Sequence, residues 1–204
     1  MTTKMHSADY LNRLLLRYSG TFDIYQPYTI LEREYPAYGY FFSHVEKYVL
    51  VRAANMWSAD SYEHILFSTR EELTMADLEE YGRAVKEYIE PKLVLKGEKL
   101  PDPNHMYSYI TIAVAADRAL SPEVRKAVKK FRFEKSYMHS IRGYSQARIA
   151  VASMEDESVT LNRAGRTLKK LYESVFEEVR NGKPGYREAL KEQGIESFKQ
   201  QVPD

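Results

Sequence analysis

The chain of 204 residues contains no cysteine. Disulfide bonds, thiol nucleophiles and zinc sites built from thiolates are therefore excluded, and such an absence is typical of proteins in a reducing cytosol. The sequence also lacks an N-terminal apolar segment of the signal-peptide kind and any apolar run long enough to cross a bilayer. We therefore expect a cytoplasmic protein without a membrane segment.

Motifs that bind cofactors or metals are missing too. The nine glycines form neither a G-x-G pattern nor a Walker loop, and the five histidines have no metal-ligand spacing. Residues 143–147 come nearest to a G-x-S-x-G nucleophile elbow but lack its second glycine. We expect no cofactor and no metal, and the lack of a recognisable catalytic set favours a protein that is not an enzyme.

Tyrosine is the residue that the chain has in excess, with 17 tyrosines against one tryptophan. A tyrosine side chain joins an apolar ring to a hydrogen-bonding hydroxyl, so it suits half-buried sheet faces and subunit interfaces. Sheet packing is the interpretation that we favour.

Periodicity and capping residues predict an alternation of helices and strands. The helices are expected after Ser7, from Met75 to a stop before Pro91 with Thr74 and Asp77 as a variant capping box, after Ser121-Pro122, and from Arg163 to Arg180 with Asn162 as the cap. The strands are expected at residues 38–44, 47–56, 62–68, 107–115, 131–137, 141–152 and 158–161. Turns are expected at residues 43–46 and 58–61, and residues 107–137 are expected to form a parallel βαβ unit.

This pattern predicts an α+β fold, in which a mixed sheet is flanked by helices and extended by a C-terminal strand pair and long helix. We expect one domain over residues 1–182. Residues 183–204 are expected to be a tail that forms a loosely docked helix.

The order helix, three strands, helix, strand over residues 7–137 resembles the core of restriction-endonuclease-like nucleases. Enzymes of that family place an Asp on the second strand and Glu-x-Lys on the third, where these residues hold a divalent metal for phosphodiester hydrolysis. Here the second strand, residues 49–54, has no Asp, and Leu66 and Ser68 stand at the Glu and Lys positions of the third. The resemblance therefore implies the architecture without its metal chemistry. The whole chain is also similar to a family of uncharacterised proteins from anaerobic bacteria, which has no function to transfer.

Positive charge is concentrated in residues 121–170, where twelve Lys or Arg stand against five Asp or Glu, a net +7. Basic residues interleaved with aromatic ones suit a nucleic-acid backbone or another anionic partner, although a solvated surface would have the same composition. Cations in the first half of the 163–180 helix oppose its macrodipole, which also favours an anionic partner. The expected binding residues are Arg125, Lys129, Arg132, Lys135, Arg142, Tyr144, Arg148, Arg163 and Arg166.

A non-catalytic binding protein is the leading hypothesis, and two alternatives remain. One is a nuclease or other hydrolase whose site has moved to other carboxylates, with Glu46, Asp60, Glu63 and Asp117 as the candidates. The other is a structural protein that forms a homo-oligomer through the tyrosine-rich segments 38–40 and 107–109.

Overall fold

The computed structural model of the protein describes residues 5–47 and 57–194. A sheet of seven strands lies at its centre, in the order β1-β4-β5-β6-β8-β7, with β9 also paired to β8. Strands β1, β4 and β5 are antiparallel, β5, β6 and β8 are parallel, and β7 and β9 both run antiparallel to β8. The strands of the sheet are β1 (Asp23–Tyr25), β4 (Ala37–Lys47), β5 (Trp57–Arg70), β6 (His105–Ala116), β7 (Glu134–Ser136), β8 (Tyr144–Ser153) and β9 (Ser158–Leu161). Strands β2 (Tyr28–Ile30) and β3 (Arg33–Tyr35) form a separate hairpin.

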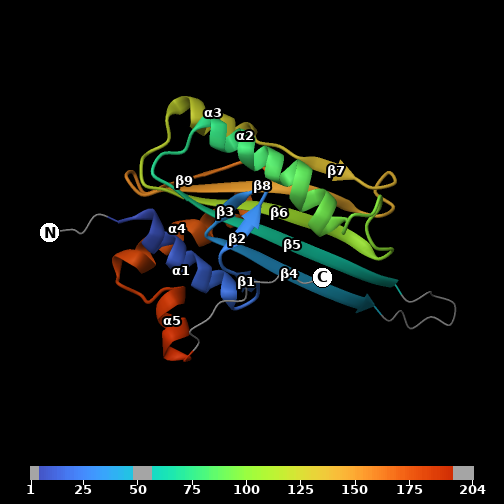
Figure 1. Ribbon diagram of the computed structural model, residues 1–204, viewed down its shortest axis with the longest axis horizontal. Coiled ribbons are helices and arrows are strands. Elements are labelled where there is room, and N and C mark those ends of the chain that lie inside the picture. Colours follow the sequence, from blue (N-terminus) through green and yellow to red (C-terminus); the bar gives the residue numbers. More distant parts are fainter. Residues whose placement is uncertain (1–4, 48–56, 195–204) are drawn as a thin grey trace.

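Helices cover both faces of this sheet (Figure 1). One face packs against α1 (Ser7–Ser19) and α4 (Lys169–Arg180), the other against α2 (Met75–Arg83), the π-helix η1 (Ala84–Val94) and α3 (Pro122–Lys130). The short 3₁₀ helix η2 (Arg166–Leu168) precedes α4, and α5 (Tyr186–Glu192) contacts α1. The α+β class with a mixed sheet between helices is thus confirmed.

Alternation along the parallel strands assigns their side chains to two cores. On β5, Ile65 and Phe67 pack with α1 and α4, whereas Leu66 packs with α2 and η1. A strand that is apolar on both faces is typical of the centre of such a sheet. No helix in the described part of the chain is both long and apolar enough to cross a membrane.

The two turns expected around β4 and β5 are wrong. Both strands continue through residues 43–46 and 58–61, because they pair with each other from Ala37 opposite Phe67 to Lys47 opposite Trp57. This ladder provides backbone hydrogen bonds that the local turn signals could not outweigh. The strand expected at residues 47–56 lies, apart from Lys47, outside the described residues.

The helix that begins after Thr74 does not stop before Pro91. Thr74 caps α2 through the expected reciprocal contacts with Asp77, but α2 leads directly into η1, which contains Pro91. A proline ring clashes with the carbonyl four residues back in a regular α-helix, and a widened π-turn relieves that clash. Within η1, Glu90 is buried and only 4% exposed.

The strand parallel to β6 is β8, not the segment 131–137. That segment forms only the short β7, whose three residues are exposed and run antiparallel to β8 at the sheet edge. Periodicity does not encode strand direction, so the sequence could not distinguish these pairings. Ser121 does cap α3, by accepting a hydrogen bond from the backbone N–H of Val124.

The turn that leads into β8 depends on Gly143. Its φ is +72°, and a Cβ added there would lie 2.1 Å from the carbonyl oxygen of Met106.

We expect Gly143→Ala to lower the free energy of unfolding by more than about 2 kcal/mol, through backbone strain and overlap. Urea denaturation measures this loss, and an unchanged midpoint would contradict the structure. Gly82→Ala is the matched control, because its Cβ would meet no atom within 4 Å and alanine favours a helix by about 0.5–1 kcal/mol.

Candidate anion-binding site

The outer edge of β8 is divided between two partner strands. β7 pairs with residues 144–146 of β8, and β9 pairs with residues 150–153. The side chain of Asn162 fills the gap between them: its Nδ2 donates to the carbonyl of Ala147 (3.1 Å), and its Oδ1 accepts from the N–H of Ile149 (3.2 Å). The same carboxamide also bonds the carbonyl of Phe131 (3.0 Å) and the N–H of Gly165 (2.9 Å).

Asn162 therefore does not cap a long helix as expected. It holds the turn at residues 163–165, and α4 begins later, at Lys169. Arg163 and Arg166 consequently precede α4, and the macrodipole argument applies only to Lys169 and Lys170 in its first turn.

A pocket of about 440 Å³ opens where β7 and β9 diverge. We call it the basic pocket; it is lined by residues 129–134, 146–147 and 162–164. Four of these are cations, Lys129, Lys130, Arg132 and Arg163, and the single carboxylate, Glu134, lies 3.2 Å from Arg132. Within the described residues, no ion pair engages the other three cations. An anion placed here would meet excess positive charge.

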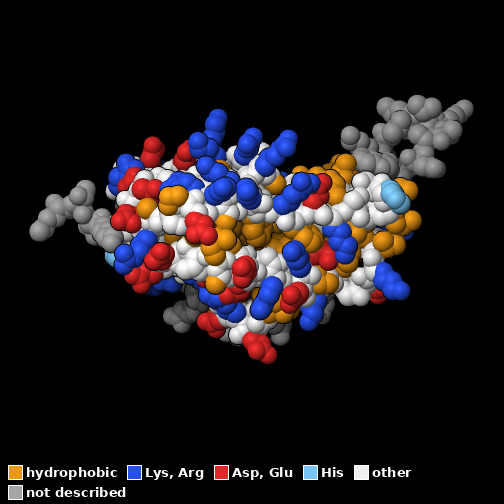
Figure 2. Space-filling model, turned by 90° about the horizontal axis from the view of Figure 1, so that it is seen from above, with side chains coloured by type: hydrophobic (Ala, Val, Ile, Leu, Met, Phe, Trp, Pro, Cys, Tyr) orange, Lys and Arg blue, Asp and Glu red, His pale blue; other side chains and the backbone are white. Residues whose placement is uncertain are grey.

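The positive charge of the pocket has only a partial structural explanation. Lys129 and Lys130 lie in the last turn of α3, where cations stabilise the carbonyl end of a helix. Arg163 comes from a different part of the chain, so that effect does not account for it. Figure 2, which looks onto the α2 and α3 side, shows Lys and Arg side chains gathered along one border of a hydrophobic band.

The structure brings together three of the nine expected binding residues, Lys129, Arg132 and Arg163, and adds Lys130. Arg166 is exposed at the start of η2. Arg125 bonds Asp156 (3.1 Å) and Thr160 (3.2 Å) instead of entering the pocket.

Two other expected residues, Lys135 and Arg142, lie near the start of β8. Lys135 donates to the buried carboxylate of Glu90 (2.8 Å), and Arg142 lies 3.4 Å from the carbonyl oxygen of Pro101. Glu90 also accepts from the hydroxyl of Tyr137 (2.9 Å). A helix that ends at Glu90, as expected from Pro91, gives no signal that this carboxylate is buried, whereas η1 continues to Val94.

Tyr144 and Arg148 lie beside Tyr109, on the face of the sheet that packs against α1 and α4. The Arg148 guanidinium lies 3.2 Å from the centroid of the Tyr109 ring and 3.5 Å from the carboxylate of Glu63. Burial raises the pKa of Glu63, which the Arg148 charge opposes. Arg148 is therefore committed to contacts within the protein.

The tyrosines proposed for self-association differ in their exposure. Tyr38 is buried, and its hydroxyl bonds His64 Nδ1 (2.6 Å). Tyr107 and Tyr109 are partly exposed, with ring centroids 4.7 Å apart.

The expected alternative carboxylates are held by separate partners. Asp60 bonds His44 near the start of β5, and Glu63 contacts Arg148. Asp117 follows the other end of β6, where it accepts from the backbone N–H (2.8 Å) and hydroxyl (3.1 Å) of Ser7; Ser7 is thus the first residue of α1 and not its cap. The side chain of Glu46 is outside the described ones. In residues 5–47 and 57–194, no three His, Asp or Glu side chains form a group that could hold a metal ion.

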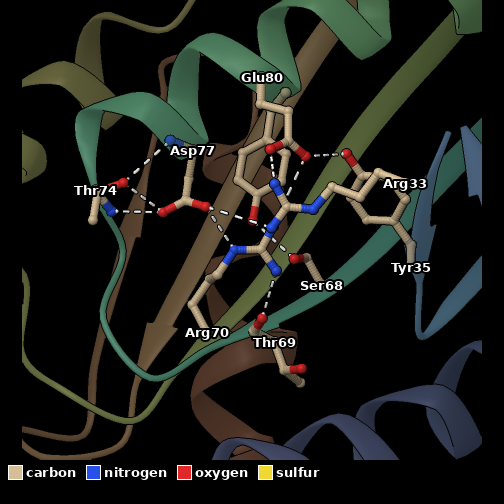
Figure 3. A network of polar contacts seen from close by, with 9 residues as sticks. Arg33, Tyr35, Ser68, Thr69, Arg70, Thr74, Asp77 and Glu80 are labelled. Carbon is tan, nitrogen blue, oxygen red and sulfur yellow. Dashed lines mark hydrogen bonds and ion pairs between the residues drawn. The ribbon is translucent and has the colours of Figure 1, made fainter. Parts of the chain in front are cut away.

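β5, the strand on which the resemblance to nucleases places the metal ligands, is held to α2 by packing and by the polar contacts that Figure 3 shows. Leu66 and Ser68 are fully buried, and Ser68 Oγ lies 2.8 Å from the hydroxyl of Tyr81 on α2. Arg70 Nε donates to Asp77 (2.7 Å), and Arg33 pairs with Glu80. These carboxylates on α2 are neutralised by arginines and stabilise the junction between β5 and α2.

His105 and Ser108 form a pair that has the geometry of a base and its nucleophile. His105 Nδ1 lies 2.9 Å from the carbonyl of Arg142, so it carries the proton, and Nε2 accepts from the Ser108 hydroxyl (2.8 Å). Burial lowers the pKa of His105 and keeps the ring neutral. Ser108 is completely buried, which leaves no path for a substrate, and we assign the pair to packing.

Residues 6–174 match a protein family described as a domain of unknown function (DUF8052). No curated protein and no solved structure matches the chain. The likeness to restriction-endonuclease-like nucleases therefore stays one of element order.

We expect Asn162→Ala to lower the free energy of unfolding by about 2–4 kcal/mol, because three buried backbone groups and the part-buried carbonyl of Phe131 lose a hydrogen-bond partner. Asn12→Ala is the control: Asn12 bonds Glu188 and the N–H of Arg187 at the surface, where water replaces the lost contacts and the cost stays within about 1 kcal/mol. Equal losses in the two variants, measured by urea denaturation, would contradict the role given to Asn162.

Asp77→Asn should reduce stability in a pH-dependent way. Burial alone would raise the pKa of Asp77, but hydrogen bonds from Thr74 and Arg70 outweigh it and the net shift is downward. Its contribution, about 1–2 kcal/mol, is therefore full above the unfolded pKa of about 3.9 and is lost as pH falls through the lower folded pKa. Unfolding of both proteins at pH 7 and near pH 2 measures the difference, and a gap that widens in acid would contradict this assignment.

Proposed function

The chain belongs to this DUF8052 family, and because the family description assigns no activity, we propose from the geometry that it is a cytoplasmic bacterial protein that binds nucleic acid through the basic pocket. The observation that supports the proposal is a concave site with four cations and one carboxylate, in which three cations lack an ion-pair partner among the described residues. Protein surfaces usually interleave charges of both signs, so cations collected in a pocket favour an anionic ligand.

Phosphate groups fit the chemistry of this site. Lysine and arginine neutralise phosphates and release bound counterions, and this effect supplies most of the affinity of non-specific nucleic-acid binding. Arg132 and Arg163 can each present paired N–H donors to phosphate oxygens. The volume of about 440 Å³ falls in the range of small-ligand sites. A non-catalytic role is preferred because the lining contains no nucleophile placed next to a base.

The test compares two double variants in a fluorescence-anisotropy titration with a labelled oligonucleotide over a range of salt concentrations. Lys129→Ala/Arg163→Ala removes two pocket cations, whereas Lys183→Ala/Lys191→Ala removes two exposed cations far from the pocket, after α4 and on α5. We expect wild-type binding to weaken as salt rises, and the slope of log K against log salt to fall by about 2 in the pocket variant only.

Two results would contradict the proposal. One is absence of wild-type binding at low salt. The other is an equal loss in the two variants, which would indicate a diffuse response to net charge. Both variants change exposed residues, so their stability should stay within about 0.5 kcal/mol of wild type per substitution.

A further inference from the structure

A second hollow lies beside the basic pocket, on the α2 side of the segment 131–133. Its volume is about 430 Å³, and both hollows include Phe131, Arg132 and Phe133 in their lining. The basic pocket and this second hollow are therefore neighbours that share one short stretch of backbone.

The second hollow differs from the first in its chemistry. We call it the apolar groove, after the apolar side chains that line it: Met75, Leu78, Val85, Ala127, Phe131 and Phe133. Its charged rim is nearly balanced, with Arg83, Lys86 and Arg132 against Glu79 and Glu87. An uncharged, flat, apolar group suits this groove better than a second phosphate does.

The two phenylalanines are partly exposed although they pack against the core. Their backbone is held on both sides, because the Phe131 carbonyl accepts from Asn162 (3.0 Å) and the Phe133 carbonyl accepts from the N–H of Ala147 (2.9 Å). Aromatic rings fixed beside cations are the arrangement on which proteins stack the bases of single strands.

Building on the proposed function, we infer that the site takes a single-stranded nucleic acid, with a phosphate in the basic pocket and the adjoining unpaired base in the apolar groove. Arg132 lies between the two, in the lining of both, and its side chain is 81% exposed. Duplexes keep their bases paired and stacked inside the helix, so they would engage only the cations.

The base contact is tested with three ligands of equal length: a single strand, the same strand with abasic positions, and the duplex. Stacking contributes enough that wild type should bind the intact strand at least about fivefold more tightly than the abasic one. In Phe131→Leu/Phe133→Leu this preference should vanish, while the salt slope set by Lys129 and Arg163 is kept. Leucine retains apolar packing but has no ring for stacking.

Gly82→Leu provides a second variant that leaves the aromatic packing untouched. Gly82 lines the apolar groove, and a Cβ there would meet no atom within 4 Å. A leucine at this position should therefore occupy part of the groove and also abolish the preference for the intact strand. Equal wild-type affinity for the three ligands, or an undiminished preference in both variants, would overturn the base site. If binding still depended on Lys129 and Arg163 in that case, the anion site would stand without it.

Discussion

The carboxamide of Asn162 is the contact on which the candidate site depends. A central strand must pair its backbone groups on both edges, because a buried N–H or carbonyl without a partner costs about 1–3 kcal/mol. β8 pairs with β7 and β9 in turn, and between them the Asn162 side chain bonds the carbonyl of Ala147 and the N–H of Ile149. An asparagine side chain has the donor and acceptor of a peptide unit, so it stands in for the missing length of strand without filling the space that a strand would occupy. The basic pocket occupies that space.

The positive charges of residues 121–170 separate according to whether a carboxylate is within reach. Arg125, Lys135 and Arg148 each face an acidic side chain and contribute to the structure around it. The cations without such a partner within the described residues include Lys129, Lys130 and Arg163, which meet at one pocket. A charged group already bound in the protein must give up that contact before it binds a ligand, whereas a hydrated one gives up only water and counterions. Pairing, more than the net charge of the segment, therefore decides which cations are free to act.

Local patterns in the sequence predicted what depends on near neighbours. The caps at Thr74 and Ser121 and the strand periodicity of β6 and β8 have their causes within a few residues. The structure confirms them, because successive apolar side chains along both strands enter opposite cores. The pairing of β8 with β6, the role of Asn162 and the burial of Glu90 depend on residues far away in the chain or on the path of η1 beyond Pro91. The clustering of Lys129, Arg132 and Arg163 is of this second kind, because the end of α3 and the turn after β9 are far apart in the sequence and are joined by the contact of Asn162 with the Phe131 carbonyl. The sequence could indicate a basic region but not the pocket within it.

Hydrogen bonds hold the segment at this edge of the sheet in place, which would favour the proposed binding. The segment 131–133 lies between the basic pocket and the apolar groove, and its carbonyls are bonded to Asn162 and Ala147. A ligand that spans both hollows would contact the two phenylalanine rings and the Arg132 side chain, all of which extend from this hydrogen-bonded segment. Ordering a flexible side chain or loop on binding costs about 0.5–1.5 kcal/mol per residue, so a fixed segment preserves affinity that a mobile one would lose. β5 contributes in a different way: with Leu66 and Ser68 packed under α2 and Arg70 bound to Asp77, it anchors the helix whose other side borders the groove. The strand on which the resemblance to nucleases would place metal ligands instead packs, in this structure, against the helix that borders the apolar groove.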